Sequence, residues 1–461
     1  MPNFTNRSSA QMNHNLRQVA NSMQSALVNG NANLHRQVGK VTEINANRVV
    51  TNLKDAFVGE KCILRIPRTG QEFAAQVVAI ENGNAILSPF AGVEGLSGNA
   101  EVFGTGEAHK IEVGDRLIGK VIDGLGNPLS NQVINNTGMQ RVSITAPEND
   151  PLDRPVIDTI FETGIKTIDG FNTVGHGQRM AIFGEAGAGK SVLLSMLARH
   201  ASVDVIVLAM IGERGREVNE FLERQLPEEM RKRCVVVVST SDRPAMERIM
   251  AGHTAMTIAE HFRAKGKNVM MLFDSVTRFA RALREVGLSA GEKAVRNGFP
   301  PSVYAELPKL VERTGRTSKG SITAFFTVLV ENEGINDPVA EELASLTDGH
   351  IILDPALAQS GVYPAINLLK SKSRLMNEIV DEGHLSTAIH LKSLQAKYLD
   401  IELLVQVGEY ARGSDPMADA ALDLHQPIRE LCKQGTHEAF AMDQTISAMS
   451  ELIYEQDPAN E

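Results

Sequence analysis

Few sequences can form a loop that wraps a phosphate group, and this chain contains one: Gly184-Glu185-Ala186-Gly187-Ala188-Gly189-Lys190-Ser191. The stretch matches the pattern G-x-x-x-x-G-K-[ST], in which backbone N–H groups surround the α- and β-phosphates of a nucleotide. Lys190 would reach the β- and γ-phosphate oxygens, and the Ser191 hydroxyl would be a ligand of Mg²⁺. An apolar run at 180–183 precedes the loop, and Ser191, Val192 and the residues after them predict a helix whose N-terminus faces the phosphates. The motif therefore predicts a nucleotide-binding site.

The sequence around this loop predicts an α/β fold with a central parallel sheet. Near-continuous Val, Ile and Leu runs alternate with helical stretches, at 203–211, 235–238, 269–273 and 322–330. Strands that are buried on both faces need such runs, so we expect a parallel sheet flanked by helices. We expect this sheet to have a RecA-like arrangement, in which the phosphate loop follows one of the strands.

Charged residues follow two of the expected strands. Asp274 comes directly after the run at 269–273, where the Mg²⁺-organising aspartate of a phosphate-loop site belongs. The run at 203–211 leads into Gly212-Glu213-Arg214-Gly215-Arg216-Glu217. In a parallel sheet this turn lies at the same edge as the phosphate loop, so Glu213 is a candidate general base for hydrolysis.

The composition changes along the chain and divides it into four parts. Residues 1–37 are a polar tail with apolar residues at helical spacing, which predicts an amphipathic helix. That helix is either docked on its own protein or binds a partner or a membrane surface. Residues 38–112 alternate with period two and predict a small β-barrel. The nucleotide-binding domain then spans 113–376, and 377–461 form a helical domain whose stripe at 391, 394, 398, 401 and 405 predicts a bundle core.

Charge and composition exclude several classes of protein. The net charge is −10 and aromatic residues make up only 5%, which disfavours a nucleic-acid-binding protein. Three widely separated cysteines build neither a disulfide framework nor a zinc site. No apolar stretch approaches the length of about 20 residues that a membrane span needs, and we expect no secretion signal. These features predict a cytoplasmic protein.

Five motifs together resemble the ATPases of bacterial type III secretion systems, which are related to the catalytic subunit of the rotary ATP synthase. They are the phosphate loop and the segments 211–218, 272–279, 298–304 and 361–366. The resemblance covers residues 38–438 and leaves out the N-terminal tail. It implies a Mg²⁺-dependent ATPase, with ATP bound at the phosphate loop.

The resemblance implies roles for single residues of these motifs. Glu213 corresponds to the water-activating glutamate, and Glu217 to an acid that contacts a metal-bound water. Arg214 and Arg278 would brace the γ-phosphate region. Tyr363 would stack on the adenine.

The resemblance also implies a homohexameric ring with its ATP sites between subunits. Arg374, in Ser371-Lys372-Ser373-Arg374, would be an arginine finger that enters the neighbouring subunit's site. The loop 291–301 would face the central channel and contact a central stalk protein. Further implied partners are a peripheral stator-like regulator, export chaperones and secreted proteins. The ring would drive chaperone release, unfolding and export at the cytoplasmic face of the inner-membrane secretion apparatus.

Several alternatives remain at this point. The catalytic subunit of an ion-coupled rotary ATPase has an acidic C-terminal lever that residues 377–461 do not match, whereas 402–410 resembles the secretion ATPases. The segment 239–248 looks more like injectisome than flagellar export members. A non-catalytic ring subunit would lack a glutamate at position 213. A ring-shaped RNA translocase should have a basic barrel, and residues 38–112 contain more acidic than basic residues. We therefore expect no nucleic-acid partner.

Overall fold

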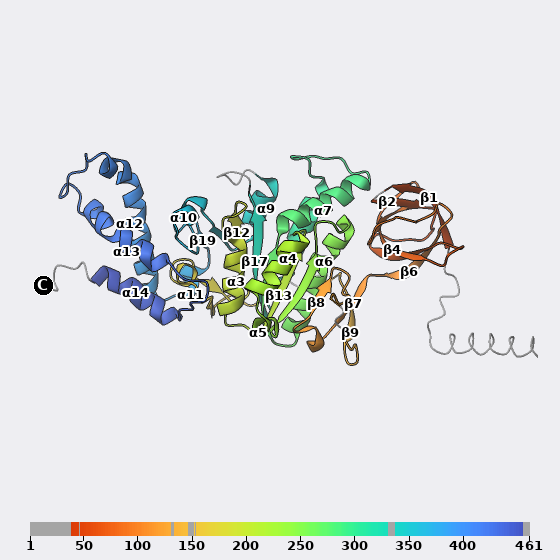
Figure 1. Ribbon diagram of the computed structural model, residues 1–461, viewed down its shortest axis with the longest axis horizontal. Helices are drawn as coiled ribbons and strands as arrows, with labels where there is room; N and C mark the ends of the chain where they lie inside the picture. The colour runs from red at the N-terminus through yellow and green to blue at the C-terminus, as the bar shows by residue number, and fades with distance from the viewer. Residues whose placement is uncertain are drawn as a thin grey trace, which may run out of the picture.

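The computed structural model describes residues 38–45, 47–130, 133–145, 152, 154–330 and 337–454. Figure 1 shows a small barrel, a central α/β region and a helical region arranged in a row. The amphipathic helix predicted for residues 1–37 lies outside the described residues. In the part of the chain that the structure covers, no helix combines the length and the apolar character that a membrane crossing requires.

The N-terminal region is a closed barrel with the strand order β1-β2-β5-β4-β3-β6. Alternate residues point inward, so that Cys62 and Leu64 of β3 are buried while Arg65 is exposed. The predicted barrel is confirmed. Its strands are β1 (Val38–Asn45), β2 (Arg48–Thr51), β3 (Glu60–Arg65), β4 (Glu72–Glu81), β5 (Asn84–Pro89) and β6 (Glu101–Ala108).

The central sheet has the order β19-β18-β12-β17-β15-β13-β14-β8, with β16 beside β17. All pairings are parallel except those of β16 and β19. The predicted parallel sheet is confirmed. Its strands are β8 (Val121–Asp123), β12 (Arg179–Gly184), β13 (Val205–Ile211), β14 (Cys234–Ser239), β15 (Asn268–Asp274), β16 (Gly315–Arg316), β17 (Ser321–Leu329), β18 (Gly349–Ile352) and β19 (Lys372–Ser373).

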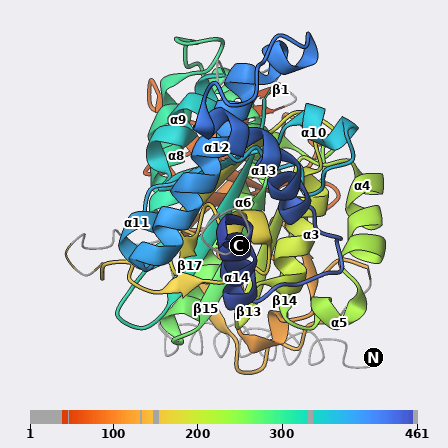
Figure 2. The same ribbon diagram turned by 90° about the vertical axis from the view of Figure 1, so that its left-hand side faces the viewer.

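Helices cover both faces of this sheet, as Figures 1 and 2 show. In β12, Ala181 and Phe183 belong to one hydrophobic core, and Met180 and Ile182 belong to the other. The first core contains α6 (Ala245–Ala264), α7 (Val276–Ser289), α8 (Pro301–Glu312) and α9 (Pro338–Leu346). The second contains α3 (Lys190–His200), α4 (Gly215–Glu220), the π-helical turn η3 (Phe221–Gln225) and the edge of α5 (Glu228–Arg231).

Short elements connect the barrel to the sheet. Strands β7 and β9 pair with each other, as do β10 and β11. Ile111 and Val113 of β7 already pack into the first core of the sheet. The connecting elements are β7 (Lys110–Val113), η1 (Asp115–Leu117), β9 (Gln140–Ser143), β10 (Ile160–Phe161), α2 (Lys166–Asp169) and β11 (Val174–Gly175).

The C-terminal region is helical, and among the described residues no strand follows β19. Leu391 and Leu394 of the predicted stripe lie in a core that also contains Leu424, Met449 and the ring of Phe171. The predicted helical domain is confirmed, whereas the domain boundaries at 112 and 376 remain predictions. The helices of this region are α11 (Met376–Ile379), α12 (Glu382–Gln406), α13 (Pro416–Cys432) and α14 (Met442–Tyr454), whereas α10 (Pro355–Gln359) lies earlier, between β18 and β19.

A buried ion pair fixes α8 against α6. Arg313 Nε and Nη2 donate to the two carboxylate oxygens of Glu260 at 2.9 and 2.7 Å, and Arg313 also donates to Thr257 Oγ1. We expect Arg313→Ala to lower the free energy of unfolding by about 3–5 kcal/mol, because it leaves the Glu260 carboxylate without its partner. Urea unfolding followed by circular dichroism measures this loss.

The matched control is Arg224→Ala, which removes an exposed pair with Glu220 at 3.2 Å. It should cost about 0.5 kcal/mol or less. Equal losses for the two variants would contradict the assignment of Arg313 as a buried structural charge.

Candidate active site

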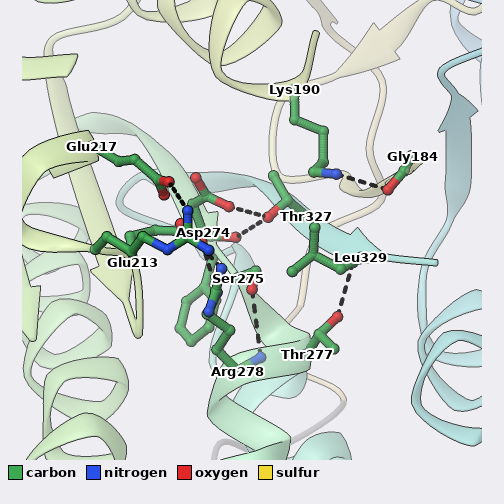
Figure 3. A network of polar contacts seen from close by, with 12 residues as sticks. Gly184, Lys190, Glu213, Glu217, Asp274, Ser275, Thr277, Arg278, Thr327 and Leu329 are labelled. Carbon is green, nitrogen blue, oxygen red and sulfur yellow. Dashed lines mark hydrogen bonds and ion pairs between the residues drawn. The ribbon is translucent and has the colours of Figure 1, made fainter. Parts of the chain in front are cut away.

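Three strands of the sheet carry polar residues to one edge. The phosphate loop follows β12, Asp274 ends β15, and Glu213 lies just after β13. Because these strands are parallel, their carboxyl ends meet at the same edge. Figure 3 shows the resulting cluster, with Lys190 on one side of Asp274 and Glu213 on the other.

The phosphate loop is closed by its own lysine. Lys190 Nζ donates to the carbonyl oxygens of Gly184 at 2.7 Å and Glu185 at 2.8 Å. Gly189 precedes α3 with φ +91°, a conformation that favours glycine. Burial lowers the pKa of Lys190 to about 8, and the nearby carboxylates Asp274 and Glu213 oppose that shift. Lys190 is thus a cation held close to two acids.

Asp274 is a buried carboxylate at the centre of the cluster. Its Oδ1 accepts a hydrogen bond from Thr327 Oγ1 at 2.6 Å. Burial raises the pKa of Asp274, and the Thr327 hydrogen bond and the Lys190 charge oppose this shift. Sequence reasoning missed Thr327, which lies within the apolar run at 322–330.

Glu213 and Arg278 form a bidentate pair. Arg278 Nε donates to Glu213 Oε1 at 2.9 Å and Nη2 to Oε2 at 3.3 Å. The Glu213 side chain is only 14% exposed. Burial and the Asp274 charge raise the pKa of Glu213 to about 7, against the lowering effect of Arg278. A carboxyl group whose pKa is near neutrality can accept and release a proton at the pH of the cell.

Arg214 and Glu217 lie at the rim of the cluster. Arg214 Nη1 is 3.2 Å from Glu217 Oε1, in the first turn of α4. The Arg214 side chain is 78% exposed, so that its guanidinium faces outward. Glu217 lies close enough to Glu213 to contribute to the raised pKa of that carboxyl group, and Arg214 lies on the solvent side.

The residues predicted to hold Mg²⁺ offer suitable oxygen atoms. Asp274 contributes a carboxylate, Ser191 a hydroxyl group at the start of α3, and Glu217 a second carboxylate further out. Mg²⁺ prefers hard oxygen ligands and takes few from protein, the rest coming from phosphates and water. The donor set therefore fits this ion. Among the described residues, no cluster of three or more His, Cys, Asp and Glu side chains with the geometry of a protein-only metal site occurs.

Two residues that sequence reasoning did not assign fix the start of α7. Ser275 caps this helix, its hydroxyl accepting from Arg278 N at 3.4 Å. Thr277 Oγ1 accepts from the backbone N of Leu329 at 2.9 Å, which joins α7 to the end of β17. These contacts hold the turn of α7 that carries Arg278. Ser275 and Thr277 lie inside the segment 272–279, which the sequence analysis identified as a motif without giving these two residues a role.

Tyr363 lies on the loop between α10 and β19, in the connection that begins at the end of β18. Its side chain is 44% exposed, and its carbonyl oxygen accepts from the backbone N of Gln434 at 2.8 Å. The buried Gln434 side chain accepts from Lys166 N at 3.0 Å and donates to Gly164 O at 2.7 Å. His200, at the end of α3, contacts the carbonyl of the same stretch at Thr436. Helical and nucleotide-binding regions are thus joined beside Tyr363.

Arg374 lies away from the cluster in its own chain. Its backbone N donates to Asp348 O, and Asp348 N donates to the carbonyl of Arg179, the first residue of β12. The phosphate loop begins at the other end of this six-residue strand, about 16 Å away. Arg374 Nη2 donates to Ala344 O at 3.2 Å. One chain therefore does not bring Arg374 to its own phosphate loop.

Three family models match the chain. The nucleotide-binding domain of the ATP synthase alpha/beta family matches residues 164–373, and the beta-barrel domain of that family matches 37–106. The T3SS EscN ATPase C-terminal domain matches 380–451. This last match falls on the region that distinguishes secretion ATPases from an ion-coupled rotary subunit, and it argues against the rotary alternative.

Curated relatives agree with these matches. The type 3 secretion system ATPase of Sinorhizobium fredii is 43% identical over 415 residues, which are 90% of this chain and 92% of that protein. The chain belongs to the type III secretion ATPases. The assembled ATPase EscN from enteropathogenic E. coli has a TM-score of 0.85 and 45% identity, covering 90% of this chain and 100% of that chain. As a type III secretion ATPase, the protein is an enzyme that acts on ATP.

Flagellar relatives of this ATPase are also similar. The flagellum-specific ATP synthase of Bacillus subtilis is 41% identical over 91% of this chain and 95% of that protein. Injectisome and flagellar members therefore match at nearly equal identity. The assignment to the injectisome group from the segment 239–248 remains a prediction.

Proposed function

We propose that the protein hydrolyses ATP in a homohexameric ring and thereby drives chaperone release, unfolding and export of proteins through a type III secretion system. The ring would work in the cytoplasm, at the inner face of the membrane that carries the secretion apparatus. The observation that carries the proposal is the convergence of Lys190, Asp274 and the Glu213–Arg278 pair at one sheet edge.

Glu213 is the general base of the proposed reaction. Its carboxylate takes a proton from water while the water oxygen bonds to the γ-phosphorus, and the bond from that phosphorus to the β-phosphate oxygen breaks. The Arg278 guanidinium holds the carboxylate in one orientation through two hydrogen bonds. Lys190 would bind the β- and γ-phosphates after exchanging its bonds to Gly184 and Glu185.

Further residues complete the proposed site. Ser191 and Asp274 would hold Mg²⁺, with Glu217 in contact with its water, and the ion would neutralise phosphate charge. Tyr363 would stack on the adenine from its exposed position on the loop. Arg374 would enter the site of the neighbouring subunit, which agrees with its distance from the phosphate loop of its own chain.

The proposed partners follow from relatives. EscN has also been solved in complex with its central stalk EscO, in a structure with a TM-score of 0.82 and 45% identity to this chain. We propose an equivalent stalk contact for the loop 291–301. A peripheral regulator, export chaperones and secreted proteins would be further partners, and the tail 1–37 would bind a membrane surface or a protein.

Flagellar export is a second candidate function. The 41% identity to the flagellum-specific ATP synthase of B. subtilis favours it. Complementation of a flagellar export ATPase deletion by this gene, scored as restored swimming, distinguishes the two systems.

Shared sites predict a steep dependence of turnover on protein concentration. We expect a dilute monomer to be nearly inactive, and the specific activity to rise as rings close, since assembly is linked to concentration by mass action. ATP turnover and particle mass should be measured on the same dilution series. A constant specific activity across a range in which the mass stays monomeric would refute the shared site.

A further inference from the structure

Gly212 lies between the end of β13 and the proposed base, under the side chain of Arg278. Its φ is +73°, in the left-handed region that favours glycine. A Cβ atom placed on Gly212 would lie 2.7 Å from Arg278 Cδ and 2.8 Å from Arg278 Cβ. Both distances are far inside van der Waals contact. The aliphatic stem of Arg278 therefore occupies the space that any other residue at 212 would fill.

The backbone around Gly212 has little freedom to yield. Gly212 N donates to Ser239 O at 2.7 Å, and Glu213 O accepts from Ser241 N at 2.9 Å. The peptide groups on either side of the Gly212–Glu213 peptide are thus hydrogen-bonded to the end of β14 and to the turn that follows it. Displacing this backbone would break two hydrogen bonds, whereas Arg278 Cγ and Cδ can move away by a change of rotamer, which leaves only the contact with Arg278 Cβ at 2.8 Å.

The stem that passes over Gly212 leads to the guanidinium that orients Glu213. Arg278 Nε and Nη2 reach Glu213 at 2.9 and 3.3 Å, and the backbone of Arg278 is fixed by the cap on Ser275. With the backbone of both partners fixed, the route of the stem decides whether the two hydrogen bonds form. That route is open only if residue 212 has no side chain.

We propose that Gly212 is a positioning residue, whose missing side chain lets Arg278 reach across it and fix the Glu213 carboxylate for proton transfer. This inference rests on the proposed function, in which Glu213 activates water. The inference explains why a glycine precedes Glu213. Gly212 then affects catalysis only through the position of Arg278.

The test begins with Gly212→Ala. Turnover at saturating ATP should fall about 10- to 100-fold, the worth of a charge-assisted hydrogen-bonded pair, while the dissociation constant of a fluorescent ATP analogue changes by less than about twofold. Gly215→Ala is the matched control three residues along, where an added Cβ meets nothing within 4 Å and φ is not positive. It should keep turnover within about twofold of the original protein.

A second variant separates the lost space from backbone strain. Asparagine tolerates a positive φ better than alanine but carries the same Cβ atom. Gly212→Asn should therefore lose turnover to about the same extent as Gly212→Ala, and it serves as the test protein if the alanine variant does not fold. Near-original turnover in Gly212→Asn would overturn the proposal, because strain rather than space would then explain the glycine.

A double-mutant cycle decides whether Gly212 acts through Arg278. In an Arg278→Ala background there is no guanidinium to misplace, so adding Gly212→Ala should change turnover by less than about twofold. The melting temperature can still fall, because a Cβ clash with α7 persists. An undiminished second loss of turnover would overturn the proposal. A failure of the proposed function gives a different result. If Glu213 does not activate water, Glu213→Gln keeps near-original turnover whatever the cycle shows.

Discussion

The Glu213→Gln protein should bind ATP with near-original affinity and lose about 10² to 10⁴ in turnover, the usual worth of a general base. Glutamine keeps the size of the side chain and one oxygen that can accept from Arg278. It has no carboxylate to receive the proton of the attacking water. Steady-state turnover and equilibrium binding of a fluorescent ATP analogue measure the two properties separately.

Two further variants calibrate this result. Lys190→Ala should lose affinity and turnover together, because Lys190 would contact the phosphates of bound ATP. Glu220→Gln, at the exposed end of α4, removes a carboxylate seven residues away whose partner is Arg224. It should leave both properties unchanged. If Glu213→Gln hydrolyses ATP as fast as Glu220→Gln does, Glu213 is not the base.

Removing Arg374 should stop catalysis without preventing ATP binding. We expect Arg374→Ala to bind ATP and to turn over about 10³-fold more slowly, as for other arginine fingers, because charge on the γ-phosphate is no longer neutralised. Lys370→Ala is the matched control, an exposed cation four residues earlier on the same segment. It should retain activity.

A mixing experiment shows which subunit supplies the finger. Arg374→Ala and Glu213→Gln proteins are each nearly inactive, but a head-to-tail ring takes the phosphate loop from one subunit and the finger from the next. With random mixing, roughly a quarter of the interfaces regain both original residues, so partial activity should return. Mixed rings whose composition is confirmed by mass, and which stay inactive, would place Arg374 outside the neighbouring site.

The elements nearest the phosphate loop were predictable from sequence, because their signals are local. Glycine positions, the lysine and the apolar strand before them specify a phosphate loop within a few residues. Asp274 and Glu213 follow long apolar runs, and a parallel sheet requires such strand ends to meet. The structure brings both residues to that edge.

Contacts between distant segments were not predictable in the same way. Thr327 lies 53 positions from Asp274, and no spacing rule links a threonine inside one strand to an acid at the end of another. Strands β18 and β19 were missed because they are short and their pairing depends on long-range order. Gln434 was missed because one glutamine on a connecting stretch carries no pattern at all. The resemblance implied that Arg374 enters the site of a neighbouring subunit, and this role remains a prediction.

The bonds of Gln434 have a consequence for protein engineering. The connection between α13 and α14 is hydrogen-bonded to Tyr363, Gly164 and Lys166, which all lie in the part that matches the nucleotide-binding family model. An exchange of helical regions between relatives would thus also replace part of the support beneath the loop that carries Tyr363. We expect chimeras that exchange this region to have an altered Michaelis constant for ATP, unless the donor region keeps a glutamine at this position.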